Sequence, residues 1–231
     1  MSLFPQYWSE APCDLYLPKD EVHVWLAHLD QRNLPKEDFW EILSDEEHLK
    51  AQRLRSRRDR TRFVSSHGVF RLILGHYLKI KPSDVHISCE VHGKPFIANI
   101  KKCTLQFNMA HSSDLALFAF SCDHRIGIDI ERIQDLPEAE YIVEAFFTQD
   151  EKNALGQVRA DQKLETFFRL WTLKEAYTKA LGSGLSYKFD RCDPFAENNK
   201  NWTRKLFIPA NCYQAAIVVE GQIKKFIHWK Y

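Results

Sequence analysis

The chain has 231 residues, with 32 basic and 31 acidic side chains and a formal net charge of +1 at pH 7. At 45% hydrophobic and 27% charged residues, the composition is that of a globular protein and excludes disordered and collagen-like chains. The near-neutral total also argues against a protein that binds nucleic acid over its whole surface.

Two further features concern the cellular compartment. No apolar run approaches the roughly 18 residues that span a bilayer, and residues 1–6 show neither a basic nor a long apolar segment of a signal peptide. The six cysteines lie far apart without a CxxC pair, which is typical of reduced thiols. We therefore expect a cytoplasmic protein that has no membrane partner.

The predicted elements of the first half follow from hydrophobic periodicity and capping signals. They are a strand over 21–27, a helix that begins after Ser44, a helix over 63–78 that ends before Pro82, and short strands over 86–90 and 94–97. Residues 107–113 are expected to form a loop just before a strand.

The second half shows the same kinds of pattern. The predicted elements are strands over 115–121 and 125–131 joined as a hairpin, helices over 138–147, 150–155 and 161–181, and strands over 213–219 and 224–230. Gly182, Ser183 and Gly184 are expected to end the long helix. Helices and strands in each half predict an α+β protein of two similar-sized lobes, 1–114 and 115–231.

The segment GIDIE at 127–131 is the first candidate site. On a strand, Asp129 and Glu131 would share one face, about 6.5–7 Å apart at a rise of about 3.3 Å per residue. Two such carboxylates repel each other unless a cation lies between them, and oxygen ligands of this kind suit Mg²⁺ or Mn²⁺. The alternative is an ordinary solvent-facing strand with acidic residues on its outer face.

The helix over 161–181 supplies a third carboxylate. Leu164, Phe168 and Trp171 form an apolar stripe, and Glu175 lies on its continuation. A buried acid needs a cation, which could be a metal shared with the strand or Lys179 one turn further on. An exposed Glu175–Lys179 ion pair is the simpler alternative.

Three other segments carry groups that suit phosphate. Residues 50–62 hold seven basic side chains and one acidic one, which could bind phosphate, an acidic protein or nucleic acid, or form a solvated helix surface. FNMAHS at 107–112 offers His111 and Ser112, and the turn at 93–95 offers Lys94.

In their order and spacing, GKP at 93–95, FNMAHS at 107–112, GIDIE at 127–131 and FFRLWTLKEAYTKALGSGL at 167–185 resemble the motifs of the Sfp-type 4′-phosphopantetheinyl transferases. The resemblance implies two similar α/β lobes related by a pseudo-twofold, with the active site at their junction. It also implies Mg²⁺, with Mn²⁺ as an alternative, and coenzyme A as co-substrate.

The resemblance implies roles for individual residues. The metal ligands would be Asp129, Glu131 and Glu175, the catalytic residues Glu175, Lys179 and Asp129, and the coenzyme-binding residues Lys50, Arg62, Lys94, Pro95, His111, Ser112, Asp129, Glu175 and Lys179. Arg62, which follows Asp59 before the helix, would meet the 3′-phosphate with help from Lys50. Two positions depart from the family: Ala110 stands where many members have Ser, and Glu47 where some have Lys.

The implied reaction moves phosphopantetheine from coenzyme A to a serine of an acyl or peptidyl carrier protein, as a holo-carrier-protein synthase does. Glu175, acting directly or through a water molecule, is the candidate general base. Phe146, Phe147 and Leu155 could supply an apolar docking surface for the carrier, although core packing is the simpler role for the two Phe residues. We expect a monomer with no nucleic-acid partner.

Three other functions would use some of the same residues. A metal-dependent nuclease or nucleotidyl transferase would also use three carboxylates, but it gives no reason for the GKP and FNMAHS segments. A nucleic-acid-binding module would use residues 50–62, and a degenerate family member would only bind ligand, although all three carboxylates and Lys179 are intact.

Overall fold

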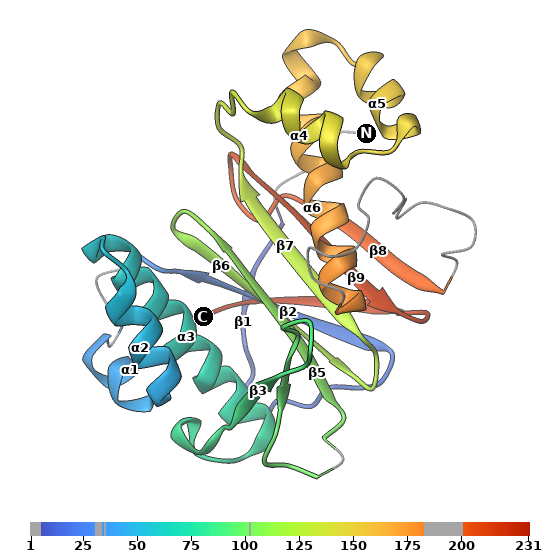
Figure 1. The fold of residues 1–231 in the computed structure, drawn as a ribbon. Helices are drawn as coiled ribbons and strands as arrows, with labels where there is room; N and C mark the ends of the chain where they lie inside the picture. The colour runs from blue at the N-terminus through green and yellow to red at the C-terminus, as the bar shows by residue number, and fades with distance from the viewer. Residues whose placement is uncertain (1–5, 31–33, 35, 102, 183–200) are drawn as a thin grey trace.

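The computed structural model describes residues 6–30, 34, 36–101, 103–182 and 201–231 (Figure 1). The helices are α1 (Lys36–Ile42), α2 (Asp45–Arg53), α3 (Arg57–Leu78), α4 (Ala139–Phe146), α5 (Gln149–Gly156) and α6 (Lys163–Leu181). The strands are β1 (Ser9–Glu10), β2 (Glu21–His28), β3 (Ile87–Cys89), β4 (Pro95–Ile97), β5 (Leu105–Ser112), β6 (Leu115–Cys122), β7 (Ile126–Arg132), β8 (Trp202–Phe207), β9 (Tyr213–Glu220) and β10 (Lys225–Lys230). Within the described ranges no helix is long and apolar enough to cross a membrane.

One layer is a five-stranded sheet in the order β1-β10-β2-β6-β5, and α3 covers one of its faces (Figure 1). Phe70 of α3 packs against Phe107 of β5 and Phe118 of β6, at ring-centroid distances of 5.3 and 5.7 Å. The strands alternate, so their other face buries a second set of apolar side chains that includes Val24 and Leu117. Both faces of this sheet are therefore buried, which explains why β6 is apolar along its length.

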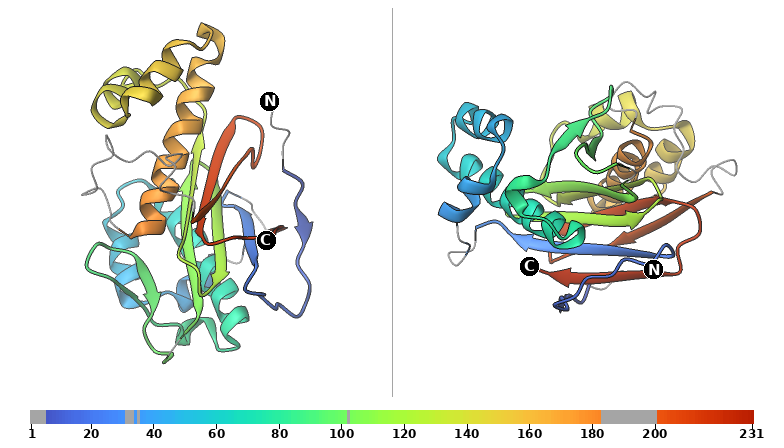
Figure 2. Two further views of the ribbon diagram at one scale, coloured as in Figure 1. Left: turned by 90° about the vertical axis from the view of Figure 1, so that its right-hand side faces the viewer. Right: turned by 90° about the horizontal axis from the view of Figure 1, so that it is seen from below.

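The other layer is a three-stranded sheet in the order β7-β9-β8, with α6 along its outer face (Figures 1 and 2). Ile126, Ile128 and Ile130 of β7 are fully buried or nearly so and pack toward the five-stranded sheet. The opposite face of β9 packs on Ala176 and Ala180 of α6. The molecule is thus layered as helix, sheet, sheet, helix, and the predicted α+β class is confirmed.

Two predictions about strands are wrong. Strands β6 and β7 do not form a hairpin: β6 pairs with β2 and β5, whereas β7 pairs with β9. Residues 107–112 are not a loop but belong to β5, where Leu105, Phe107 and Met109 supply the alternation of a half-buried strand.

Several local predictions are confirmed. The α2 helix begins after Ser44, whose hydroxyl accepts from the Glu47 amide while the Glu47 carboxylate accepts from the Ser44 amide at 2.8 Å. The α6 helix ends at Gly182 with φ +71°, in the left-handed region. Ser183, Gly184 and Leu185, the rest of that motif, lie outside the described residues.

The proposed boundary at 114/115 lies in the turn between β5 and β6, which are paired strands of one sheet. Strand β10, from the end of the chain, joins the same sheet by pairing in parallel with β2. Because the sequence order does not separate the two layers, the division into 1–114 and 115–231 stays a prediction.

Candidate functional site

The face of β7 opposite its isoleucines is where the site begins. The Asp129 residue is 4% exposed and Glu131 is half-buried, because α6 covers this face. Such close packing depends on Gly127, where an added Cβ would lie 2.0 Å from the Ala176 carbonyl oxygen and 2.4 Å from the Ala180 nitrogen. The alternative of a solvent-facing strand is therefore wrong for Asp129.

The α6 helix brings Glu175 and Lys179 to this face. The Lys179 ammonium donates to Oδ1 of Asp129 at 2.6 Å, so its ion pair runs between elements rather than along the helix to Glu175. Glu175 is half-buried and lies near enough for the charges of Asp129 and Lys179 to act on it. The structure thus gathers the three predicted carboxylates and the lysine between β7 and α6.

The electrostatics of this cluster show carboxylates that repel one another. Burial, and then the charge of Asp129, raises the pKa of Glu131 to about 7. Burial and Asp129 likewise raise the pKa of Glu175, and burial raises that of Asp129 itself. Although burial opposes it, the Asp129 carboxylate raises the pKa of Lys179.

The cluster has the chemistry of a site for Mg²⁺ or Mn²⁺. Oδ2 of Asp129 is buried and has no hydrogen-bond partner in the described part of the chain, and all the donors are carboxylate oxygens, which these ions prefer. As placed here, no three His, Cys, Asp or Glu side chains among the described residues converge closely enough to hold an ion. The residues fit the ion by chemistry, and their role as ligands stays a prediction.

The β3–β4 hairpin borders one side of the cluster. A hollow of about 220 Å³ is lined by Lys94 and Pro95 of this hairpin together with Glu175 and Lys179 of α6. The Lys94 ammonium donates to the Ala180 carbonyl at 2.7 Å, at the C-terminal end of α6, and burial lowers its pKa to about 8. In this arrangement Lys94 ties the hairpin to α6.

A second hollow, of about 260 Å³, lies on the other side of β5 and is lined by Arg62, His111 and Ser113 among others. Arg62 donates to both carboxylate oxygens of Asp30 at 2.9 and 2.7 Å, and its side chain is 13% exposed. Arg62 lies inside α3 rather than before it, because the helix begins at Arg57. Lys50 is exposed in the last turn of α2 and does not line this hollow.

His111 and Ser112 are neighbours on β5 and therefore point to opposite faces of the strand. His111 lines the same hollow as Arg62. Its pKa is lowered by desolvation from the surrounding protein and then by the charges of His67 and Lys179. The Ser112 hydroxyl donates to Oε2 of Glu131 at 2.9 Å. His111 thus lines the hollow that contains Arg62, whereas Ser112 contacts the carboxylate cluster.

Two contacts at the site, those of Asp30 and Asn108, were not predicted from the sequence. Asp30 also accepts from Arg58 at 2.9 Å, so part of the basic stretch is an ordered ion-pair network rather than a free cationic surface. Asn108 of β5 accepts from the backbone amide of Ile128 at 2.8 Å. No sequence signal joins these pairs, because their partners lie 20 or more residues away.

The departure at Glu47 has a local explanation. The side chain is almost fully buried, where it accepts from Arg71 at 2.6 Å and pairs with His67 at 2.9 Å. Despite its burial, these partners and the Ser44 amide lower the pKa of Glu47 to about 2. Glu47 therefore ties α2 to α3. Ala110, the other departure, is buried in the core between the sheets.

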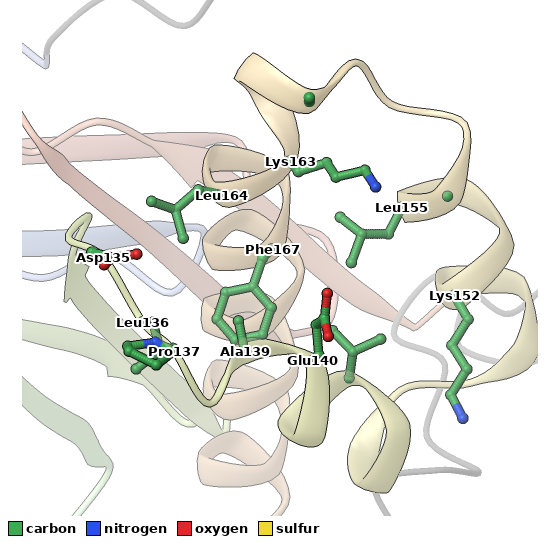
Figure 3. Close-up of a pocket in the computed structure, with 13 residues that line it drawn as sticks. Asp135, Leu136, Pro137, Ala139, Glu140, Lys152, Leu155, Lys163, Leu164 and Phe167 are labelled. Carbon is green, nitrogen blue, oxygen red and sulfur yellow. The ribbon is translucent and has the colours of Figure 1, made fainter.

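A separate hollow of about 500 Å³ lies between α4, α5 and α6, and contains none of the predicted site residues (Figure 3). Leu155, Leu164 and Phe167 line it. Phe147 is 2% exposed and stacks on Phe167 at 5.6 Å, so it belongs to the core, whereas Phe146 and Leu155 are half-buried. Of the predicted docking residues, only Leu155 lines this hollow.

Comparison with known families gives two adjacent matches. Residues 125–227 match the family described as "4′-phosphopantetheinyl transferase superfamily". Residues 35–123 match the family described as "4′-phosphopantetheinyl transferase, N-terminal". The two matches together cover most of the chain, including every predicted site residue.

Individual relatives agree with these matches. The chain is 38% identical to the 4′-phosphopantetheinyl transferase HetI of Nostoc sp. over 180 residues, which are 78% of this chain and 76% of the relative. It is 32% identical to psf-1 of Bacillus pumilus over 71% of this chain and 69% of that one, and 30% identical to Sfp of Bacillus subtilis over 67% and 66%. A crystal structure of the holo-[acyl-carrier-protein] synthase of Thermotoga maritima matches 43% of this chain and 64% of that one, with a TM-score of 0.35 and 24% identity.

Proposed function

Because the chain belongs to the 4′-phosphopantetheinyl transferase superfamily, we propose that it moves 4′-phosphopantetheine from coenzyme A to a serine hydroxyl of an acyl or peptidyl carrier protein. The resemblance inferred from the motifs is thus confirmed, and the protein is an enzyme of the transferase class. We place the reaction between β7 and α6. The observation that supports this location most directly is the buried cluster of Asp129, Glu131, Glu175 and Lys179.

In this proposal Asp129, Glu131 and Glu175 hold one Mg²⁺, and Mn²⁺ would be accepted by the same oxygen ligands. When bound, the ion neutralises and orients the coenzyme's pyrophosphate. The protein's part is to keep three carboxylates together in a site that burial makes unfavourable for their negative charge. That cost is the reason why a divalent cation is expected here rather than a fourth polar side chain.

The reaction needs one group that accepts the serine proton and another that stabilises the negative charge on the phosphate. The serine oxygen forms the new bond to phosphorus, the bond from phosphorus to the leaving oxygen breaks, and adenosine 3′,5′-bisphosphate departs. Glu175 is the proposed general base, acting directly or through a water molecule, because its carboxylate lines the hollow beside Lys179. Lys179 places positive charge beside the phosphate on which negative charge develops.

The coenzyme's remaining phosphate suits the second hollow. Arg62 and His111 face each other there, and an arginine offers several donors that match a phosphate. We propose that Arg62 binds the 3′-phosphate with Lys50 as a peripheral contact, and that Lys94, Pro95 and Ser112 border the path of the coenzyme. Lys94 and Ser112 also have partners within the protein, so their effect on the coenzyme would be partly through those partners.

We propose that a monomer suffices, because one chain supplies all the groups named above. No membrane or nucleic-acid partner is needed for the reaction. A cytoplasmic location agrees with cysteines that form no disulfide in the described part of the chain. We place carrier docking near the hollow lined by Leu155, which offers an apolar surface beside α6.

The test is mass spectrometry of an apo carrier protein after incubation with this enzyme, coenzyme A and Mg²⁺. We expect the carrier to gain the mass of one phosphopantetheine arm, and EDTA to prevent the gain. Asp129→Ala and Glu175→Ala should each abolish transfer while their circular dichroism stays that of the wild type. Wild-type rates in either variant at saturating Mg²⁺ would contradict the assignment.

A further inference from the structure

The two sheets meet along an edge where no strand ladder joins them. Among the described residues, strand β5 pairs only with β6, and β7 only with β9, yet β5 and β7 lie side by side. An edge strand carries a row of backbone N–H groups that need partners. The partners found here are side chains rather than the backbone of the neighbouring strand.

Two side chains of β5 provide these contacts. Oδ1 of Asn108 accepts from the Ile128 amide at 2.8 Å, and the Ser112 hydroxyl accepts from the Arg132 amide at 3.0 Å. Asn108 and Ser112 lie four residues apart and point to the same face of β5, while their two partners lie four residues apart on β7. The equal spacing shows that the contacts repeat in register, with the strands running in the same direction.

The two anchored amides flank the acidic residues of the site. Asp129 follows Ile128, and Glu131 precedes Arg132, so the section of β7 that bears both carboxylates is held at each end. The Ser112 hydroxyl does more, because it also donates to Oε2 of Glu131 at 2.9 Å. With one bond accepted and one donated, this hydroxyl fixes both the backbone and the side chain.

We propose that Asn108 and Ser112 are positioning residues, which form a side-chain seam between β5 and β7 and set the relative placement of Asp129 and Glu131 for a divalent cation. This inference rests on the proposed function, in which the two carboxylates are metal ligands. It assigns Ser112 to the orientation of Glu131 rather than to contact with the coenzyme. It also gives Asn108 a role in the reaction, which no motif argument assigned.

The first measurement needs neither coenzyme nor activity. The probe is Mn²⁺ alone, titrated into the protein and followed by electron paramagnetic resonance. Groups that orient metal ligands typically contribute about 10- to 100-fold to metal affinity. We expect Ser112→Ala and Asn108→Ala to weaken Mn²⁺ binding by about tenfold or more. Ser112→Thr, which keeps the hydroxyl on a strand-favouring residue, should restore it.

The matched control is Ser121→Ala. Ser121 is fully buried on β6, and its hydroxyl donates to the His124 carbonyl at 2.6 Å, so the variant loses a comparable bond away from the site. Its Mn²⁺ affinity should equal that of the wild type. A loss as large as that of Ser112→Ala would mean that any lost buried hydroxyl weakens binding, and would overturn the inference.

A second readout is amide hydrogen exchange in metal-free protein by nuclear magnetic resonance. The Ile128 amide should exchange faster in Asn108→Ala, and the Arg132 amide faster in Ser112→Ala, because each loses its acceptor. In Asn108→Asp the acceptor oxygen is kept, so protection at Ile128 should remain. Unchanged protection in both alanine variants would refute the seam even if one of them bound metal poorly.

Enzyme kinetics distinguish a positioning role of Ser112 from a direct contact of Ser112 with coenzyme A. Variants of Asp129 and Glu131 test the metal site on which the inference rests. If Ser112 contacts the coenzyme, Ser112→Ala will raise the KM for coenzyme A and leave Mn²⁺ affinity unchanged, which would overturn the inference. If it positions Glu131, the Mg²⁺ concentration for half-maximal rate will rise instead. If Glu131→Ala and Asp129→Ala also bind Mn²⁺ normally, the metal site itself is wrong. If only the seam variants bind normally, the seam alone fails.

Discussion

The close approach of α6 to β7 can be tested with a single methyl group. In Gly127→Ala the new Cβ would lie 2.0 Å from the Ala176 carbonyl oxygen, whereas real Cβ contacts below 3.0 Å are essentially never seen. The helix must therefore retreat by at least 1.0 Å, the difference between 3.0 and 2.0 Å. The two nearest atoms, the Ala176 carbonyl oxygen and the Ala180 nitrogen, belong to the backbone of α6, so no side-chain rotation can relieve the contact.

The retreat has two expected effects. Overpacking a well-packed core typically costs about 1–3 kcal/mol, and we expect about 3 kcal/mol here because a helix backbone has to move. At roughly 2–4 °C per kcal/mol for a chain of this size, the Tm should fall by about 6–12 °C. Glu175 and Lys179 move with α6, and a misplacement of about 1 Å at a reacting centre can cost about 100-fold in rate.

Two other glycines serve as comparators. In Gly68→Ala the Cβ meets the Phe39 ring at 2.4 Å, and neither residue lines the two hollows of the site, so stability should fall while kcat/KM well below the Tm is retained. In Gly156→Ala nothing lies within 4 Å, so the Tm should not fall. Circular dichroism on heating and the carrier-protein assay measure both effects. A Gly127→Ala enzyme with wild-type Tm and kcat/KM would refute this account of the packing.

Three further predictions follow from individual contacts. Arg62→Ala should raise the KM for coenzyme A about tenfold or more, as expected for a lost charged hydrogen bond, and have a much smaller effect with 3′-dephospho-coenzyme A; equal effects would contradict the phosphate role. Burial lowers the pKa of His228 to about 3. As the pH falls below about 6.5, the unfolded chain therefore protonates His228 while the folded chain does not, so the folded state loses stability as the pH falls from about 6.5. In urea titrations between pH 6.5 and 4, His228→Asn should therefore lose less stability than the wild type; equal slopes would exclude His228 as the cause. The fully buried Lys174 donates to Glu151 at 2.7 Å, so Lys174→Met should cost about 3–5 kcal/mol, and adding Glu151→Leu should recover part of that loss, whereas additive losses would mean that the pair is not coupled.

The parts of the fold that could be predicted are those set by neighbours in sequence. The start of α2 depends on Ser44 and Glu47, three residues apart, and the faces of β7 depend on alternation from Ile126 to Glu131. Both patterns are complete within one segment, so their physical cause is visible in the sequence. Strand β5 could not be recognised in this way, because Asn108, His111 and Ser112 place polar groups on both of its faces, as a loop also would.

Long-range pairing could not be predicted in this way. A two- or three-residue connection after β6 is typical of a hairpin, yet β7 pairs with β9, about 90 residues further on. Lys179 has Glu175 one turn away, yet its ammonium is 2.6 Å from Asp129, 50 residues away in sequence. In both cases the distant partner is favoured because α6 packs on the three-stranded sheet. This packing cannot be read from the pattern of residues within one segment.

The charges of the cluster connect this packing to the proposed chemistry. When ionised, Asp129, Glu131 and Glu175 sum to −3, and Lys179 adds +1, which leaves −2 in a largely buried space. Without a further cation the protein can lower this charge only by protonation, and burial together with the charge of Asp129 raises the pKa of Glu131 to about 7. A divalent cation would bring the sum to zero while all three carboxylates stay ionised. In the proposed function, the coenzyme's remaining phosphate would then meet the positive charge of Arg62, in the hollow that it lines together with His111 on the other side of β5.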